Sequence, residues 1–591
     1  MPEYLAPGVY VEETSFRAKS IEGVGTSTTA FVGPARKGPF RANSNDLTQP
    51  EMLTSYGDFE RLYGTYSDFG YTGVRRTNYL AHAARAFFNE GGARLYVCRV
   101  VGSNATAATA AASAATGDEA IAFTARFPGS AGNGRIDITE ISTPASDRVM
   151  ENAPPGTFLR TGPADTPVHH VKMGSTWHPA ANPAGAAAVT SELAGATPRV
   201  ITLIVTTIDD MPPGEPRTGD RAQGNVLSYE DLGLHPSHPR YIGTVLKQTP
   251  DSRAEQLQNA YFISVGKDVA PSELQSALFT VDAKAVTTRT LLLDGGADGD
   301  PPGSAAYASA LELLAGMEDI SIVAAPGSAA YADAQAINGA LIAHAEGRRA
   351  YRIAVLDTPP QQTPGQVRTL RGLMDSRYAA LYYPWVVVSN PLFRPGREDI
   401  PREIALPPSG FVSGIYARND IQRGVHKAPA NEVVRSALRF EVDVNFGQQE
   451  GLNPIGVNCL RLLSGRGYRV WGARLISSDP EWKYVSDRRY FNYLEASIDR
   501  GTQWAVFEPN GERLWANVRQ TIADFLYNEW RNGALLGASQ EEAFFVRCDR
   551  STMTQNDLDN GRLVCLIGVA IIRPAEFVIF RIGQKTADSR G

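Results

Sequence analysis

Between residues 285 and 388 the chain alternates short apolar runs with stretches of helical periodicity, and this alternation restricts the fold more than any other feature. The strand-like runs are residues 291–293, 320–325, 353–356 and 378–388, and the helix-like stretches between them are residues 307–317, 331–345 and 366–374. Strands that alternate with helices form a parallel sheet whose two faces those helices cover. The pattern therefore predicts an α/β core.

Patterns elsewhere in the chain extend this core. Residues 28–33 are typical of a buried strand that ends at a Gly-Pro turn, and residues 75–90 and 94–101 predict a helix followed by a strand. The clearest helix is predicted over residues 513–531. Its apolar stripe consists of Leu514, Val518, Ile522, Phe525, Leu526 and Trp530.

Composition changes after residue 104. Residues 105–116 consist only of Ala, Thr and Ser, which favours a flexible connector or else a short Ala helix. Short strands separated by Gly- and Pro-rich turns follow, so residues 105–250 are interpreted as an inserted β-rich domain. A length of 591 residues agrees with several domains, since a domain usually has about 100–200 residues.

The net charge of -6 excludes a basic nucleic-acid surface over the whole chain. The longest apolar run has ten residues, 563–572, which is too short to span a bilayer. The N-terminus lacks the features of a secretory signal.

The four cysteines form no CxxC pair and are expected to be core residues in a reducing compartment. A soluble protein made inside the cell is predicted.

No dinucleotide, P-loop, zinc-protease or nucleophile-elbow motif was found, so no cofactor and no catalytic residue is predicted. The alternative is a metal-dependent α/β enzyme that uses Asp294, Asp298 and Asp300, which follow a strand in the sequence LLLDGGADGD. A polar turn before a helix is the simpler interpretation of this cluster.

Both ends of the chain have strand patterns. Val9, Tyr10, Val11 and Glu12 belong to a strand that a tether, residues 16–25, separates from the body. Residues 563–572 predict a strand buried on both faces, and residues 576–582 predict a further strand. Such terminal strands can pair within their own chain, as in a monomeric scaffold, or join a sheet edge of another copy.

Many segments of the chain resemble contractile tail sheath proteins of myovirus-type phage tails and related injection systems. The resemblance includes PGVYVEE, TTAFVGPARKGP, AFFNEGGARLYVCRV, PPSGFVSGIYARNDIQRGVHKAPAN, LNPIGVNCLRLLSGRGYRVWGARL and RPAEFVIF. These motifs occur in order over most of residues 1–104 and 285–585.

The resemblance implies a structural protein and not an enzyme. Such subunits form stacked hexameric rings around an inner tube, exchange terminal strands with neighbouring copies, and contract to drive the tube through a target envelope. The implied partners are further copies of the chain, the tube protein, and baseplate and terminal cap proteins, with no nucleic acid and no membrane insertion. Assembly is expected in the bacterial cytoplasm, as part of a phage tail or tail-like particle.

The expected fold class is α/β, or α+β overall, with several domains: a central mixed or parallel sheet, an inserted β-rich domain and extended strand arms. The expected parts are an N-terminal arm (1–20), a core (21–104 with 251–400), an outward-facing insertion (105–250), a tube-facing domain (401–572) and a C-terminal arm (573–591).

The expected arm residues are Val9, Tyr10, Val11 and Glu12 at one end and Phe577, Val578, Ile579, Phe580 and Ile582 at the other. The candidate tube-facing residues are Thr552, Asp557, Asp559 and Arg562, whose polar character is equally that of an exposed turn.

Overall fold

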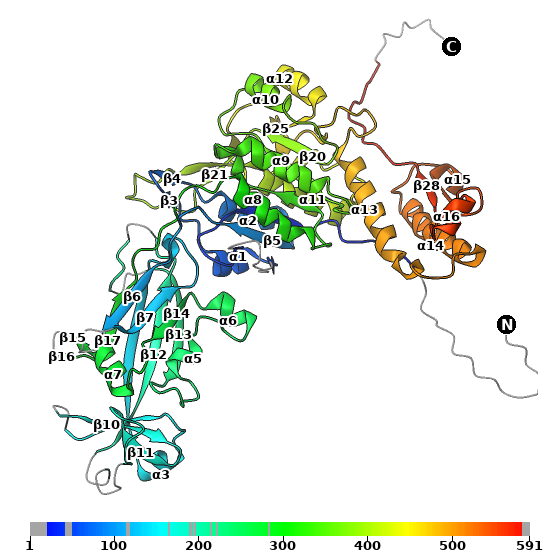
Figure 1. Ribbon diagram of the computed structural model, residues 1–591. Coiled ribbons are helices and arrows are strands. Elements are labelled where there is room, and N and C mark those ends of the chain that lie inside the picture. The colour runs from blue at the N-terminus through cyan, green and yellow to red at the C-terminus, as the bar shows by residue number, and fades with distance from the viewer. Residues whose placement is uncertain are drawn as a thin grey trace, which may run out of the picture.

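The structure is a computed structural model, described here over residues 20–41, 50–113, 119–163, 166–187, 193, 197–212, 215–219, 223–281 and 284–581. Figure 1 shows three regions: a central α/β body, an elongated β-rich region on one side of it, and a smaller helical region on the other side, next to α13 (Val485–Gly501). The predicted α/β class with several sheets is confirmed.

A nine-stranded mixed sheet forms the middle of the body. Its strands lie in the order β2 (Glu51–Leu53), β5 (Leu95–Val100), β1 (Thr29–Pro34), β18 (Ile322–Ala324), β19 (Ile353–Asp357), β20 (Ala379–Tyr383), β25 (Val457–Leu463), β26 (Gly467–Val470) and β23 (Glu432–Val433). Neighbours from β5 to β25 are parallel, and the pairings at both edges are antiparallel.

Helices cover both faces of this sheet. Phe31 of β1 packs on one face, under α2 (Tyr79–Glu90) and α11 (Pro408–Arg423), whereas its neighbours Ala30 and Val32 pack on the other face, under α8 (Ser304–Ala315) and α9 (Ala334–Ala345). This alternation follows from the two-residue repeat of a strand. The other elements of the body are α1 (Tyr56–Tyr63), α10 (Pro364–Arg371), α12 (Phe446–Leu452), β3 (Phe69–Tyr71), β4 (Val74–Arg76), β21 (Val386–Ser389), β22 (Glu403–Leu406) and β24 (Arg439–Phe440).

The single long strand predicted over residues 378–388 is instead two strands. β20 belongs to the central sheet, and β21 pairs with β22 and β24 in a separate three-stranded sheet. Pro384 lies between them, and a proline has no N–H to continue a ladder.

The elongated region is built on two sheets. The larger holds β11 (Thr176–Pro179), β10 (Val168–Met173), β9 (Phe158–Thr161), β12 (Arg199–Asp209), β8 (Arg135–Pro144) and β17 (Thr288–Leu292), with β13 (Asn225–Leu232) paired to β12; the smaller holds β14 (Tyr261–Val265), β7 (Glu119–Ala125) and β6 (Thr109–Ser113). The remaining elements are α3 (Asp147–Asn152), α5 (Ile242–Val245), α6 (Arg253–Gln258), α7 (Pro271–Phe279), β15 (Thr280–Val281) and β16 (Lys284–Ala285). The two sheets share one apolar core.

Three details differ from the sequence-based expectation. The Ala-rich segment is neither a connector nor a helix where it is described, because β6 pairs with β7 and buries Ala112. The β-rich region continues past residue 250, since β14 and β17 pair with its strands. The central sheet continues past residue 400, through β25, β26 and β23.

The smaller helical region contains α14 (Glu512–Arg531), which confirms the predicted amphipathic helix. Its stripe packs with α13 and with α15 (Gln540–Ala543), α16 (Gln555–Asp559), β27 (Phe544–Arg547) and β28 (Leu566–Val569) in one core. Within the described ranges, no helix combines the length and the apolar character that a bilayer-spanning segment needs.

Candidate functional site

The C-terminal segment leaves the body with four consecutive exposed hydrophobic side chains. Phe577, Val578, Ile579 and Phe580 are 70%, 68%, 79% and 82% exposed. The structure forms no strand over residues 577–581, because no strand of the described chain lies beside them. Burial of each such side chain against another surface is worth about 1.5–3 kcal/mol. Five further predicted arm residues lie outside the described residues: Val9, Tyr10, Val11, Glu12 and Ile582.

Glu576, immediately before this apolar segment, is held firmly by the body. Its carboxylate accepts hydrogen bonds from Arg474 Nε (2.7 Å) and Nη2 (2.6 Å), from Asn453 Nδ2 (2.7 Å) and from Tyr484 Oη (2.9 Å). Burial would raise the pKa of Glu576, but the hydrogen bonds from Arg474, Asn453 and Tyr484 outweigh it and hold the pKa at about 2. The segment is therefore fixed at residue 576.

A second contact holds the same segment three residues earlier. Arg573 Nε lies 3.4 Å from Asp487 Oδ2, at the start of α13. Burial raises the pKa of Asp487 to about 6, and the positive charge of Arg573 only partly offsets this effect. Because the Asp487 side chain is 1% exposed, it depends on Arg573 for charge compensation.

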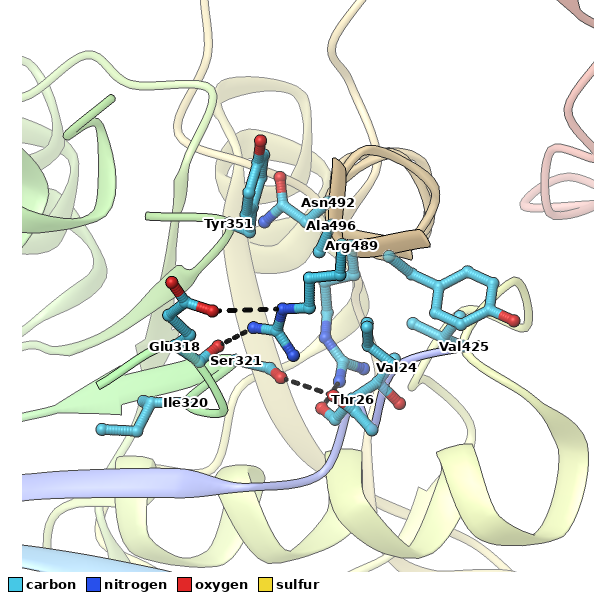
Figure 2. A pocket seen from close by; sticks show the side chains of 13 residues that line it. Val24, Thr26, Glu318, Ile320, Ser321, Tyr351, Val425, Arg489, Asn492 and Ala496 are labelled. Atoms are coloured by element: carbon cyan, nitrogen blue, oxygen red, sulfur yellow. Dashed lines mark hydrogen bonds and ion pairs between the residues drawn. The ribbon is translucent and has the colours of Figure 1, made fainter. Parts of the chain in front are cut away.

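The N-terminal segment is held against the same helix. Val24 N donates a hydrogen bond to Ser497 Oγ (3.1 Å), and Arg489 Nη2 donates to the Thr26 carbonyl oxygen (3.0 Å). Arg489 also forms a two-pronged pair with Asp420 of α11, at 2.8 and 2.6 Å. Figure 2 shows Val24, Thr26 and Arg489 beside a cavity of about 20 Å³, which has room for about one water molecule.

α13 and its N-cap therefore contact both terminal segments. Tyr484 and Asp487 hold the C-terminal segment at one end of the helix, whereas Arg489 and Ser497 hold the N-terminal segment farther along. The sequence alone does not reveal these anchoring residues, because the ion-pair partners Arg489–Asp420 and Arg474–Glu576 lie 69 and 102 positions apart.

β27 and β28 form a two-stranded antiparallel sheet that packs against α14. The predicted burial of residues 563–572 on both faces is wrong: Leu566 is 52% and Ile567 36% exposed, and Phe545 of β27 is 50% exposed. Except for a single bridge between Leu535 and Ile571, the outer edges of this sheet have no strand partner within the described ranges.

The four candidate tube-facing residues lie together on a surface turn that contains α16. Asp557 accepts a hydrogen bond from Thr554 Oγ1 (2.7 Å), and Arg562 N donates to the Asp557 carbonyl oxygen (2.7 Å). Thr552 Oγ1 donates to the Val564 carbonyl oxygen (2.8 Å), and Asp559 accepts from Gln555 Nε2 (2.8 Å). These contacts explain how the turn is shaped, and they leave Asp559 and Arg562 exposed.

The three carboxylates of the enzyme alternative have separate partners. Asp294 is exposed and pairs with Arg217 at 2.7 Å, and Asp300 accepts from Asn104 Nδ2 at 3.0 Å. Asp298 is buried, and accepts from Ser130 N (2.8 Å) and Oγ (2.9 Å) and from Gly70 N (2.8 Å). No group of three potential metal ligands was found among the residues described.

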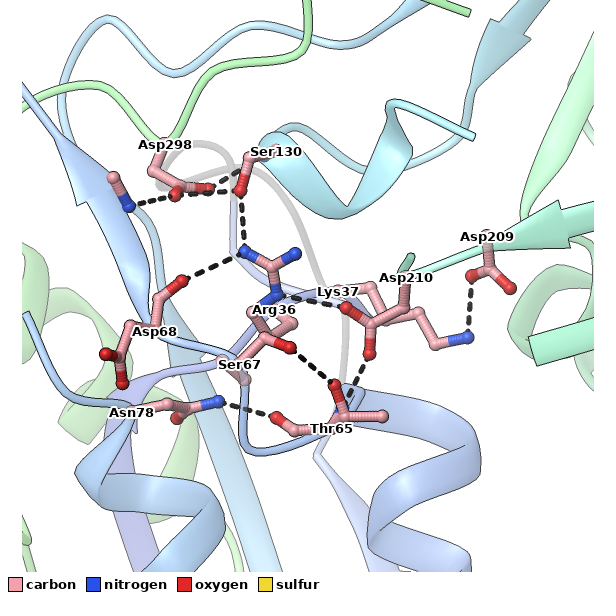
Figure 3. Close-up of polar contacts among 12 residues, drawn as sticks. Arg36, Lys37, Thr65, Ser67, Asp68, Asn78, Ser130, Asp209, Asp210 and Asp298 are labelled. Carbon is pink, nitrogen blue, oxygen red and sulfur yellow. Dashed lines mark hydrogen bonds and ion pairs between the residues drawn. The ribbon is translucent and has the colours of Figure 1, made fainter. Parts of the chain in front are cut away.

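Asp298 belongs to a polar junction between the body and the β-rich region, shown in Figure 3. The buried Arg36 of the body donates from Nε to Asp210 Oδ1 (3.0 Å) and from Nη1 to Ser130 Oγ (2.6 Å). Lys37 pairs with Asp209 at 2.6 Å, and burial raises the pKa of Asp209 although Lys37 opposes this. The contacts of Asp298 are therefore structural.

Two family models match consecutive parts of the chain. The phage tail sheath protein central domain matches residues 301–474, and the phage tail sheath C-terminal domain matches residues 477–585. Both terminal anchors on α13 and the exposed segment 577–580 lie in the second match.

Curated relatives agree with these matches. A prophage major tail sheath protein of Pseudomonas aeruginosa (strain UCBPP-PA14) is 25% identical over 267 residues, which are 44% of this chain and 64% of the relative. The tail sheath protein of Enterobacteria phage T4 is 23% identical over 177 residues, which are 29% of this chain and 26% of the relative. The chain thus spans less than two thirds of the length of either relative.

Solved structures share the fold. The sheath complex of the extracellular contractile injection system PVC in its contracted state is 18% identical with a TM-score of 0.52, and 100% of each chain is covered. The helical sheath of the anti-feeding prophage in its contracted state is 21% identical with a TM-score of 0.52, covering 98% of this chain and 100% of that one. The fold and these matches define a structural protein of contractile tails. The chain belongs to the contractile tail sheath family.

Proposed function

We propose that this chain is a structural subunit of a contractile sheath, in a phage tail or a tail-like injection particle. The subunits assemble in the bacterial cytoplasm as stacked hexameric rings around an inner tube. Neighbouring copies are joined by exchange of their terminal strands, so the sheath contracts without separating and drives the tube through a target envelope.

The observation that carries this proposal is the exposed segment Phe577–Phe580 on a firmly held base. Four adjacent apolar side chains in water are unfavourable in an isolated chain and favourable once another copy covers them. An extended segment that joins a sheet edge also gains backbone hydrogen bonds, each worth about 0.5–1.5 kcal/mol net. Together these gains support a lasting link between subunits.

The sheet of β27 and β28 supplies a suitable edge for an incoming strand. Its outer edges are largely unpaired in the described chain, and Phe545, Leu566 and Ile567 offer apolar contact surface. An arm of one subunit that adds to this sheet in a second copy would bury both apolar surfaces at once. The N-terminal strand residues Val9, Tyr10, Val11 and Glu12 are proposed to act in the same way.

The remaining roles follow from this assembly. We assign the β-rich region to the outside of the sheath and the smaller helical region to the tube side, with Thr552, Asp557, Asp559 and Arg562 as candidate tube contacts. Baseplate and terminal cap proteins are the proposed partners at the two ends of the stack. No catalytic activity is part of the proposal.

The test is assembly of the full chain, viewed by negative-stain electron microscopy. Removal of residues 577–591 is expected to leave the fold intact and to abolish long tubes, and removal of residues 1–15 is expected to do the same. Long tubes of normal appearance from either truncation would contradict strand exchange.

Point variants sharpen this test. Phe577 and Ile579 project to one side of an extended strand, and Val578 and Phe580 project to the other. Phe577→Ser with Ile579→Ser, and Val578→Ser with Phe580→Ser, are each expected to shorten or abolish tubes. Leu373→Ser is the matched control, since Leu373 is also exposed (59%) but lies far from both arms in sequence.

A further inference from the structure

Cys548 and Cys565 lie directly opposite each other at the end of the sheet formed by β27 and β28. The register pairs Arg547 with Leu566, so the next residues along the two strands are these two cysteines. At the other end of the same ladder, Ala570 N donates to the Ala543 carbonyl oxygen (2.8 Å), which makes that facing pair a hydrogen-bonded one.

Hydrogen-bonded and non-hydrogen-bonded pairs alternate along an antiparallel ladder. Counting from Ala543 and Ala570, the pair Cys548 and Cys565 is a non-hydrogen-bonded one. The Cα atoms of such pairs are about 4.5 Å apart, with their side chains close together. This spacing lies within the range of about 4.4–6.8 Å that a disulfide requires.

The two side chains also contact each other. Both belong to the core around α14, where Cys548 is 1% exposed and Cys565 is partly exposed. Burial raises the pKa of Cys565 to about 12 and also raises that of Cys548. Both groups are therefore neutral thiols near pH 7, which slows their oxidation because the thiolate is the reactive form.

The other two cysteines provide an internal comparison. Cys98 of β5 and Cys459 of β25 are buried in the central sheet, separated by five strand-to-strand steps. At about 4.8 Å per step they are roughly 24 Å apart and cannot be joined.

We propose that Cys548 and Cys565 form an intrachain disulfide in an oxidising environment, by exchange with a low-molecular-weight disulfide. The more exposed Cys565, as its thiolate, attacks one sulfur of the small disulfide, forms a mixed disulfide and releases one small thiolate. Cys548 then attacks the Cys565 sulfur and releases the second. Both protein protons end on the two small thiols, so the chain loses two electrons and the reagent gains them.

The bond closes the loop of residues 549–564, which contains α16 and the four candidate tube-facing residues. A cross-link of this kind restricts the unfolded chain and fastens the last rung of the two-stranded sheet. Oxidation outside the cell would thus stabilise an element that the proposed function uses, although the chemistry itself does not depend on that function.

The test exposes the full chain to oxidised glutathione at pH 8.5 and, in parallel, to dithiothreitol. Free thiols are then alkylated in denaturant and the peptides are identified by mass spectrometry. The expected result is a linked peptide pair for Cys548 and Cys565, lower in mass by two hydrogens (about 2 Da), with Cys98 and Cys459 alkylated in both samples.

Cys565→Ser serves as the control, and it is expected to leave Cys548 open to alkylation. Three outcomes would overturn the proposal: both thiols still free after prolonged oxidation, a stable glutathione adduct on Cys565, or a bond between two chains. Tube formation by the same samples, scored by microscopy, keeps this result separate from the test of strand exchange.

Discussion

At the scale of single residues, Glu576 determines where the C-terminal segment leaves the body. Its four hydrogen bonds come from three side chains that belong to different parts of the second half of the chain. Two of these bonds join a guanidinium to a carboxylate, and such charge-assisted bonds are about twice as strong as neutral ones.

Glu576→Gln removes the charge and one of the acceptor oxygens while keeping the shape. Arg474, whose side chain is 8% exposed, then loses its anionic partner, and we expect a loss of about 1.5–3 kcal/mol in unfolding free energy. Denaturant titration at pH 7 measures this, with Glu508→Gln as a control because Glu508 is exposed. Equal stability of both variants would contradict the anchoring role.

The stabilisation that Glu576 gives the wild-type protein is present above pH 4.5 and is lost as the pH falls toward 2.

Asp487 should have the opposite pH dependence. Its pKa is raised from 3.8 to about 6 by burial, so the native state binds the proton more tightly than the unfolded state does. Its contribution to stability is therefore fully present below pH 3.8 and lost as the pH rises through 6. Asp487→Asn should raise the melting temperature relative to wild type at pH 8, and this advantage should shrink between pH 6 and pH 4. Thermal melts across this range test it, and a constant difference would contradict it.

The sequence predicts the apolar character of residues 577–580 correctly, since these four hydrophobic residues are consecutive in the chain. It could not identify Arg474 or Asp487 as the residues that hold this segment. Their partners are distant in sequence, and an isolated charge in a sequence carries no sign of what it faces in the fold.

At the scale of elements, α13 is the helix that contacts both terminal segments. Its contact with the N-terminal segment depends on Arg489, whose side chain is 3% exposed and whose partner Asp420 is 4% exposed. A buried pair of this kind adds little by itself, but the loss of one partner leaves the other charge uncompensated.

Arg489→Ala should therefore lower the unfolding free energy by about 3–5 kcal/mol. Chemical denaturation measures the change, and Arg423→Ala is the matched control, because Arg423 is exposed at the end of α11. The N-terminal segment should also become more sensitive to limited proteolysis near Thr26. A loss no larger than that of the control would show that the segment is held by other contacts.

Elements with strong periodicity were predictable and those without it were not. α14 follows from the stripe that Leu514 begins, because a 20-residue amphipathic helix repeats its signal over many turns. β6 was missed because small residues such as Ala carry no alternating pattern. The apolar run of β28 predicts burial, whereas Leu566 and Ile567, which point to opposite faces of the strand, are both exposed.

At the scale of the whole molecule, the β-rich region enters and leaves the body at neighbouring points. Asp300 N donates to the Ser103 carbonyl oxygen at 2.9 Å, and Thr72 N of the body donates to the Gly299 carbonyl oxygen at 2.9 Å. Ends that lie this close are typical of domains inserted into another fold.

Replacement of residues 104–299 by a short Gly-Ser linker should therefore leave the body folded. We expect native-like circular dichroism and one cooperative thermal transition, since the strands of the central sheet and the buried residues of its two cores lie outside the excised region, from which Leu257 packs against one core. A linker of the same composition placed after residue 330 is the control, and it should disrupt folding because it interrupts the path from β18 to α9. An excised chain that aggregates would contradict this independence.

The insertion itself was predictable from the change in composition after residue 104, but its end was not. The sequence around β17 reads as the first strand of the α/β pattern, and only the pairing with β8 assigns it to the insertion. Similarly, no change in composition marks the end of the central sheet, so the expected boundary at residue 400 divided strands that belong together.

The seating of both terminal segments on α13 has a mechanical consequence. α13 has 17 residues and is about 26 Å long. A force applied to one terminal segment can therefore pass to the other along the hydrogen-bonded turns of this helix. In a lattice built from such units, this helix would form part of the path that carries a load from one copy to the next.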